Sequence, residues 1–482
     1  MQARHGQRYR WLLLLSVMVG TMASIMSSTI INVAIPDMSQ HFLLGQERAQ
    51  WVTSGFMVAM TVSMLTTPWM LARYGYRRTY VATMILLLVG GIGGGFANTF
   101  SFVLAARVAE GLAAGIVQPI PAIIIMRAFE PHEQGRASGI FGMGVVLAPA
   151  IGPSVGGVLV DLFGWRSIFF MVVPFCLASL WLAYRYVPVT APGNVAANRK
   201  GASLDWGGLL LVSAGTLCLL NGMVALHGDS LLEATLLLSG AVLALILFIG
   251  WQRRMTRTNR EPLMNLALYG YRPFAMGSIV AFIYGTALFG STYLLPVYML
   301  LGLGLSASLV GSILLPAGFV LAVTIALVGR LADRHPTYLL VSIGLALLAL
   351  SFSLMLTVTL NSALWLLVVW GTLGRLGLGF ILPSLNLGSL RALDKTLISQ
   401  GSSTISFVRM LGGAIGVSLC GIVLEWRLAV HGDSLTVAAT SPARLAAFNE
   451  TFLMLAALCA LALLAAWRLR EIPVARALHP EN

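Results

Sequence analysis

Charged side chains are scarce in this sequence. Only 10% of its 482 residues are Asp, Glu, Lys or Arg, and just 17 are acidic. A soluble domain carries roughly 25% charged residues because its surface faces water. Hydrophobic residues make up 58% of the chain, and the mean hydropathy is +0.87. The shortage of charge therefore excludes a soluble catalytic domain and indicates that lipid surrounds most of the chain.

Cysteine is rare as well, and several catalytic patterns are missing. Cys176, Cys218, Cys420 and Cys459 all lie inside apolar runs, so we expect neither disulfides nor a metal-binding cysteine pair. The sequence has no His/Glu metal spacing, no Gly-x-Ser-x-Gly turn and no phosphate-binding loop. A membrane-embedded enzyme and an ATP-driven pump are therefore disfavoured, and we expect no metal ion and no cofactor.

Long apolar runs take up most of the chain. A helix needs about 20 mostly apolar residues to cross ~30 Å of hydrocarbon, and only helices or closed barrels satisfy the backbone there. Alternating ten-residue segments are missing, which favours helices. We predict fourteen spans, at 11–35, 50–72, 79–97, 101–126, 137–160, 167–187, 204–226, 232–251, 274–300, 307–328, 338–359, 362–388, 399–424 and 449–467. The first run is longer than the apolar core of a signal peptide, so we expect it to be retained.

The distribution of positive charge tests this helix count. With a cytoplasmic N-terminus, 23 of the 30 Lys and Arg residues fall in cytoplasmic segments, and only Arg48, Arg166, Arg427 and Arg444 fall in external loops. Cytoplasmic loops normally carry this excess. We therefore predict an inner-membrane protein with both termini in the cytoplasm. These loops also account for the net charge of +13, so we expect no nucleic-acid partner.

Two polar segments divide the chain. A linker at 188–203 follows the sixth predicted helix, and a basic stretch at 252–273 follows the eighth. We predict an N-terminal six-helix bundle over residues 1–190, a two-helix insertion over 204–251 and a C-terminal six-helix bundle over 265–482. The turns at 71–78 and 329–334 are weakly alike, and repeated six-helix halves are a transporter architecture.

Five short motifs follow one another in a fixed order. They are SSTIINVAIP at 27–36, RVAEG at 107–111, APAIGPSVGG at 148–157, WRSIFF at 165–170 and SFVRMLGGAIG at 406–416. Together they resemble the fourteen-span drug:proton antiporter branch of the major facilitator superfamily, over nearly the whole chain. The resemblance implies an all-α membrane protein with the major facilitator fold. It also implies a monomer that exports an amphiphilic small molecule in exchange for protons by alternating access.

Charged residues inside the predicted spans are candidates for a substrate and proton pathway. Arg107 and Glu110 lie three residues apart on one helix face, and Gln118 falls near that face. A charge at the bilayer centre costs about 2.5–3.5 kcal/mol, so we expect this face to point at protein or at a water-filled cavity. A self-neutralising structural ion pair is the alternative. Arg375 and Arg409 are the other cations inside the spans, and Arg375 either lines the cavity or extends toward an interface.

Helix 1 departs from the family pattern. The resemblance implies an acidic residue where Ser27 stands, near Asn32, and a glutamine where Glu110 stands. The pathway then holds three arginines and one acid, which favours anionic or zwitterionic amphiphiles over lipophilic cations. Export of a lipid or an anionic metabolite without proton coupling remains open, as does a sensor that has lost transport. A periplasmic adaptor also remains open as a partner.

Two segments are candidate gates. Gly152 and Gly156 lie four residues apart, which allows close helix approach, and proline can bend a helix. With Pro153 and Gly157, they suit a moving helix between the halves, although ordinary packing is the alternative. The resemblance also implies a gating turn made of Gly329, Asp333 and Arg334. Asp205 matches a further family position, or simply favours a helix N-terminus.

The first-half copy of the gating turn departs from the family pattern. Pro68 replaces the glycine and Ala72 replaces the aspartate. For the arginines of this turn, the simpler interpretation is that they fix topology alone.

Overall fold

A computed structural model describes residues 8–44, 46–189, 203–226, 231–360, 362–434 and 440–470, which form helices and turns only. The helices are α2 (Arg8–His41), α3 (Gln46–Ser63), η1 (Met64–Thr66), α4 (Thr67–Tyr74), α5 (Tyr76–Gly95), α6 (Phe100–Val117), α7 (Ile120–Ala128), α8 (Gln134–Phe163), α9 (Ser167–Tyr186), α10 (Trp206–Ala225), α11 (Leu231–Arg257), η2 (Leu266–Gly270), α12 (Arg272–Val297), η3 (Tyr298–Gly302), α13 (Ala307–Leu331), α14 (Thr337–Met355), α15 (Leu364–Leu390), α16 (Ile398–Val430) and α17 (Pro442–Trp467).

The predicted all-helical class is confirmed. Thirteen segments of the described residues are long and apolar enough to cross a membrane. The 30-residue helix α8 occupies the place of the fifth predicted span, which agrees with about fourteen spans. Two spans are interrupted, because Pro68 starts α4 after the 3-10 turn η1, and Pro119 separates α6 from α7.

Helices α16 and α17 extend beyond their predicted ends. Arg427 lies in the last turn of α16 and Arg444 in the first turn of α17, so both belong to helix ends and not to a loop, and their external location stays a prediction. Their charges are paired within the structure. Arg427 Nη2 donates to Glu450 Oε1 at 2.6 Å, and Arg444 Nη2 to Asp433 Oδ1 at 3.1 Å.

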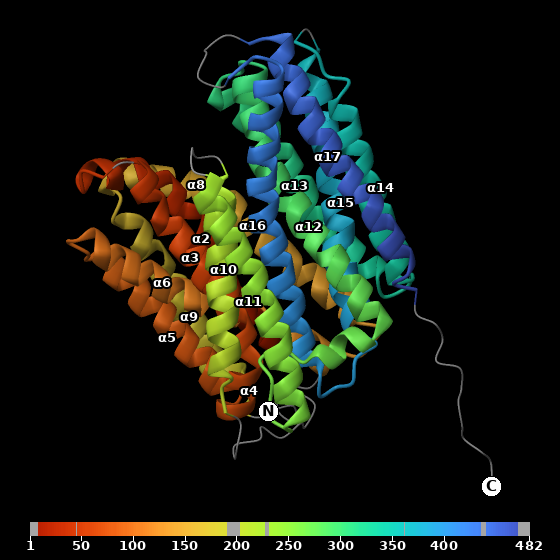
Figure 1. Cartoon of the computed structure of the whole chain (residues 1–482). Coiled ribbons are helices and arrows are strands. Elements are labelled where there is room, and N and C mark those ends of the chain that lie inside the picture. The colour runs from red at the N-terminus through yellow and green to blue at the C-terminus, as the bar shows by residue number, and fades with distance from the viewer. Residues whose placement is uncertain are drawn as a thin grey trace.

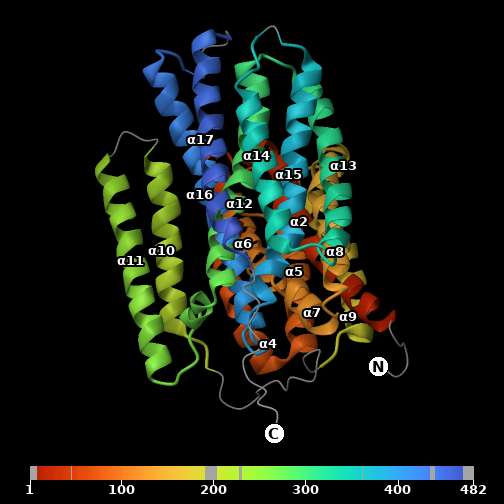
Figure 2. The ribbon, with the colours of Figure 1, turned by 90° about the vertical axis from the view of Figure 1, so that its right-hand side faces the viewer.

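The helices pack as two bundles with separate apolar cores, plus a peripheral pair. One core is built from α12–α17, and the others draw mainly on α2–α9. The two bundles lie side by side in Figure 1, coloured red to yellow and green to blue. Helices α10 and α11 pack on each other, and α10 touches α3 and α16, at the edge seen in Figure 2. We call α2–α9 the N-half and α12–α17 the C-half.

Candidate functional site

A buried ion pair lies inside the N-half. Arg107 Nη1 is 2.5 Å from Glu110 Oε2 and donates to Ser27 Oγ at 2.8 Å. The guanidinium also lies over the ring of Phe56, with Cζ 4.2 Å from its centroid. Both charged side chains are only 1% exposed. Ser27 therefore contributes a hydroxyl to the pair, at the position where the family resemblance implies an acid.

Glycines of α5 make room for Glu110. A Cβ on Gly90 would come within 2.7 Å of Glu110 Cγ, and one on Gly91 within 3.5 Å of Glu110 Oε1. Yet the pair is not fully satisfied, because Arg107 Nη2 is buried without a hydrogen-bond partner among the described residues. Such a group costs roughly 1–3 kcal/mol. In this conformation the pair is buried away from water, and Arg107 Nη2 is a hydrogen-bond donor that the pair does not use.

The other two intramembrane arginines lie in the C-half. Arg375 of α15 and Arg409 of α16 are partly buried. Arg375 Nη1 donates to Thr292 Oγ1 at 3.5 Å. The backbone of Arg409 lies directly against α12. A Cβ on Gly285 would lie only 2.0 Å from the Arg409 carbonyl oxygen. Both arginines thus lie beside α12, in the half opposite Arg107.

Asn32 and Gln118 are less enclosed than the ion pair. Asn32 is exposed and accepts a hydrogen bond from Thr53 Oγ1 at 3.1 Å. Gln118 is partly buried at the break between α6 and α7. Their place in a substrate pathway stays a prediction.

Asp333 joins the two halves at one end of the molecule. Its carboxylate accepts from the backbone N–H groups of Gly135 at 2.6 Å and Arg136 at 2.8 Å, in the first turn of α8. Arg391 Nη2 lies 3.7 Å from the same carboxylate. Burial raises the pKa of Asp333, and these three donors oppose that shift. A carboxylate at a helix N-terminus is favourable, so Asp333 caps α8 across the interface.

Glycines set the approach of α8 to α13 beside this cap. A Cβ on Gly329 would lie 2.4 Å from Gly139 Cα, and one on Gly135 would lie 2.3 Å from the Gly329 carbonyl oxygen. Arg391 Nε also donates to Gln134 Oε1 at 3.2 Å. We call Gly135, Gly139, Gly329, Asp333 and Arg391 the latch.

Of the predicted gating turn, Gly329 and Asp333 lie in the latch, whereas Arg334 is exposed. Sequence reasoning missed Gly135, Gly139 and Arg391. The spacing of Gly135 and Gly139, four residues apart, is the one signal that could have found two of them.

The predicted glycines of α8 make a different contact. A Cβ on Gly156 would lie 2.4 Å from Ile30 Cγ1, and one on Gly152 would lie 3.1 Å from Thr29 Oγ1, both on α2 of the same half. Gly157 only reaches 4.0 Å from Val33, and the side chain of Pro153 lies outside the described residues. These glycines pack within the N-half instead of between the halves, so their gating role stays a prediction.

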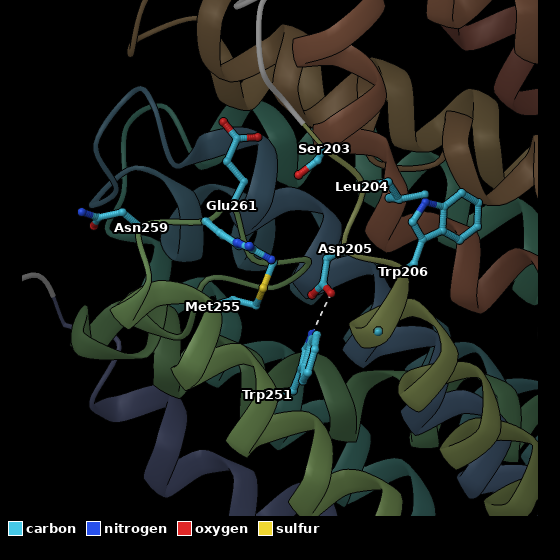
Figure 3. A pocket seen from close by; sticks show the side chains of 10 residues that line it. Ser203, Leu204, Asp205, Trp206, Trp251, Met255, Asn259 and Glu261 are labelled. Carbon is cyan, nitrogen blue, oxygen red and sulfur yellow. Dashed lines mark hydrogen bonds between the residues drawn. The ribbon is translucent and has the colours of Figure 1, made fainter.

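Asp205 fastens the insertion. Its buried carboxylate accepts from Gly208 N at 2.8 Å, Trp251 Nε1 at 2.7 Å and Gln252 Nε2 at 2.8 Å. Leu263 N adds a bond at 3.3 Å. Figure 3 shows Asp205 and Trp251 beside a cavity of about 520 Å³. Asp205 therefore holds α10, α11 and the chain leading to α12 together, away from the latch, and its gating role also stays a prediction.

A sequence profile of the Major Facilitator Superfamily matches residues 17–417. The chain belongs to the major facilitator superfamily. It is therefore a multi-pass membrane protein, a secondary transporter of a small molecule, and not an enzyme.

Relatives and solved structures agree with this family. The chain is 26% identical over 457 residues to the uncharacterized MFS-type transporter YcnB of Bacillus subtilis (strain 168), covering 94% of each chain. It is 25% identical over 422 residues to the lincomycin resistance protein LmrB of the same organism, covering 86% of each. The solved proton:xylose symporter XylE matches with a TM-score of 0.67 at 12% identity, covering 95% of each chain, a likeness in fold alone.

Proposed function

We propose that this transporter exports an amphiphilic small molecule across the inner membrane in exchange for protons, with both termini in the cytoplasm. The observation that carries the proposal is the sealed Arg107–Glu110 pair, in which both side chains are 1% exposed. Intramembrane ionisable residues that face the interior commonly mark proton relays and substrate paths. Similarity to a lincomycin resistance protein supports export of a drug-like compound.

The exchange follows from the contacts of the pair. While Glu110 is ionised, it occupies Arg107 Nη1 at 2.5 Å. In exchange, the substrate and the proton occupy the site in turn. When the site faces the cytoplasm, the ionised Glu110 carboxylate accepts from a donor group of the substrate, and the spare Nη2 donor of Arg107 holds an acceptor group. When the site faces outward, a proton from outside neutralises Glu110 and releases the substrate, and this proton leaves to the cytoplasm before the next substrate binds. A membrane potential of 100 mV adds about 2.3 kcal/mol for each charge moved.

Uncoupled export of a lipid or an anionic metabolite is the second candidate. The same observation supports it, because a sealed ion pair with a 2.5 Å contact can also be permanent. Glu110 would then stay ionised and never take up a proton. Transport would depend on the substrate gradient alone.

Removing the carboxylate of Glu110 separates the two candidates. Glu110→Gln keeps the shape and loses the titrating group, so we expect everted vesicles with an acidic lumen to lose uphill uptake of the probes dansylundecanoate and ethidium. Exchange down a probe gradient should persist. Glu261→Gln, at an exposed position, is the matched control. Full gradient-driven uptake by Glu110→Gln would refute proton transfer at this residue.

A further inference from the structure

We propose that Arg375 and Arg409 bind the anionic headgroup of an amphiphilic substrate, whose apolar tail lies on a cluster of methionines between the halves. This inference rests on the proposed transport function and names its substrate class. The methionine cluster consists of Phe56, Met57, Met60, Met64, Ala114, Phe289 and Met410.

The first step is charge balance. Glu110 is already paired with Arg107 at 2.5 Å. Within the described part of the chain, no carboxylate forms an ion pair with Arg375 or Arg409. Two positive charges thus lie at membrane depth without a fixed counter-ion, and buried charges are normally paired. An anionic ligand would supply the missing partner.

The second step is rigidity. Thr286 Oγ1 of α12 donates to the Gly412 carbonyl of α16 at 2.9 Å. A Cβ on Gly412 would lie 2.2 Å from the Phe282 carbonyl oxygen. These close contacts hold α12 against α16, so the backbone of Arg409 is fixed beside α12. Bidentate recognition of a carboxylate or phosphate favours arginine on such a fixed frame.

The third step places the apolar surface beside the charges. Met410 directly follows Arg409 and belongs to the same buried cluster as Phe56 and Met60 of the N-half. Phe289, in the same cluster, stands one helical turn before Thr292, the hydroxyl that Arg375 contacts at 3.5 Å. Methionine side chains adapt to ligands of varied shape. A buried apolar cluster between the halves therefore adjoins Arg409 in the chain and reaches the part of α12 that Arg375 contacts. This arrangement suits an amphiphile with one negative end.

Equilibrium binding without any pH gradient tests the headgroup. In nanodiscs at pH 7, dansylundecanoate should bind more tightly than its uncharged methyl ester by at least roughly tenfold, as expected for charge-assisted hydrogen bonds. Arg375→Gln and Arg409→Gln should each reduce this preference, and the double variant should abolish it. Arg409→Lys should keep part of it. Arg253→Gln, at an exposed arginine on α11, is the control.

Binding of the methyl ester reports whether each variant is folded. Equal binding of acid and ester by the unaltered protein would overturn the proposal, as would a preference that survives in the double variant. Glu110→Gln should keep the preference even where it abolishes gradient-driven uptake, which separates failure of this inference from failure of coupling. Competition by dioleoylphosphatidylglycerol distinguishes a lipid headgroup from a single-tailed amphiphile, and either result fits an anionic headgroup.

Discussion

The two ends of the molecule differ in what their hydrogen bonds join. At the end that carries the latch, bonds cross between the halves, from Gly135 and Arg136 to Asp333 and from Arg391 to Gln134. At the opposite end, bonds between described residues stay within one half. There Arg166 donates to the Ala97 carbonyl at 3.0 Å, and Arg427 to Glu450.

This difference identifies the conformation. A transporter that alternates between two states must break polar contacts at one end when it opens there. The latch is closed. Gly318 lies nearer the start of α13 and has open space where a side chain would stand. If the termini are cytoplasmic, as proposed, the structure is closed toward the cytoplasm. The following changes should weaken the latch to different degrees.

Substitution of Gly329 by valine should have the largest effect. The new Cβ would lie 2.4 Å from Gly139 Cα and 2.6 Å from the Gly135 carbonyl oxygen, both backbone atoms of α8. These atoms cannot move without the helix, and overpacking of this kind costs about 1–3 kcal/mol or more. We expect the latch to open, which pulsed electron spin resonance would detect between labels at Arg78 and His335, in a background without the native cysteines.

Gly318→Val controls for the helix itself. It adds the same side chain to α13 where no atom of the described residues lies within 4 Å, so the spin-label distances should stay unchanged. A second label pair at Phe163 and Leu360 reports on the opposite end. If Gly329→Val and Gly318→Val gave the same distances at both ends, the glycine contact would not control closure.

Asp333→Asn should have an intermediate effect. Gly135 N and Arg136 N donate to different oxygens of Asp333. Asparagine replaces one of these oxygens by an NH2 group that cannot accept, and it carries no charge beside the N-terminus of α8. Hydrogen bonds to charged groups contribute roughly 1.5–3 kcal/mol. The open fraction at the Arg78–His335 pair should rise accordingly.

Asp161→Asn, at an exposed position of α8, the helix that Asp333 caps, is the matched control for Asp333→Asn. An unchanged distribution in Asp333→Asn would show that the glycine contact alone closes this end.

Sequence reasoning reached the features that depend on local spacing. Apolar run lengths and the alternation of arginines predicted the helices, and the spacing of Arg107 and Glu110 predicted a pair that the structure places at 2.5 Å. Features that depend on distant partners were out of reach. Asp333 bonds to residues 197 and 198 positions away, and no pattern around it names them. Likewise, the partners of Asp205 lie up to 58 positions away.

The smallest expected effect concerns the turn of the N-half that corresponds to the turn carrying Asp333. Ala72 has no carboxylate to take the place of Asp333, and a different contact joins the halves nearby. Arg127 Nη1 donates to Tyr76 Oη at 2.9 Å, and Nη2 to the Lys395 carbonyl at 2.9 Å. The second bond is exposed, so water can replace it, and we expect a contribution near the lower end of the range of about 0.5–1.5 kcal/mol.

Arg127→Gln should therefore shift the spin-label distances less than Asp333→Asn does. Asp333 contacts α8, whereas Arg127 contacts the turn before α16. The two contacts share no side chain. Their effects on the closed fraction should add within about 0.3–0.5 kcal/mol. The double variant measures this directly. A shift in Arg127→Gln as large as that in Asp333→Asn, or strong non-additivity, would mean that both turns act as one gate despite the loss of the aspartate at Ala72.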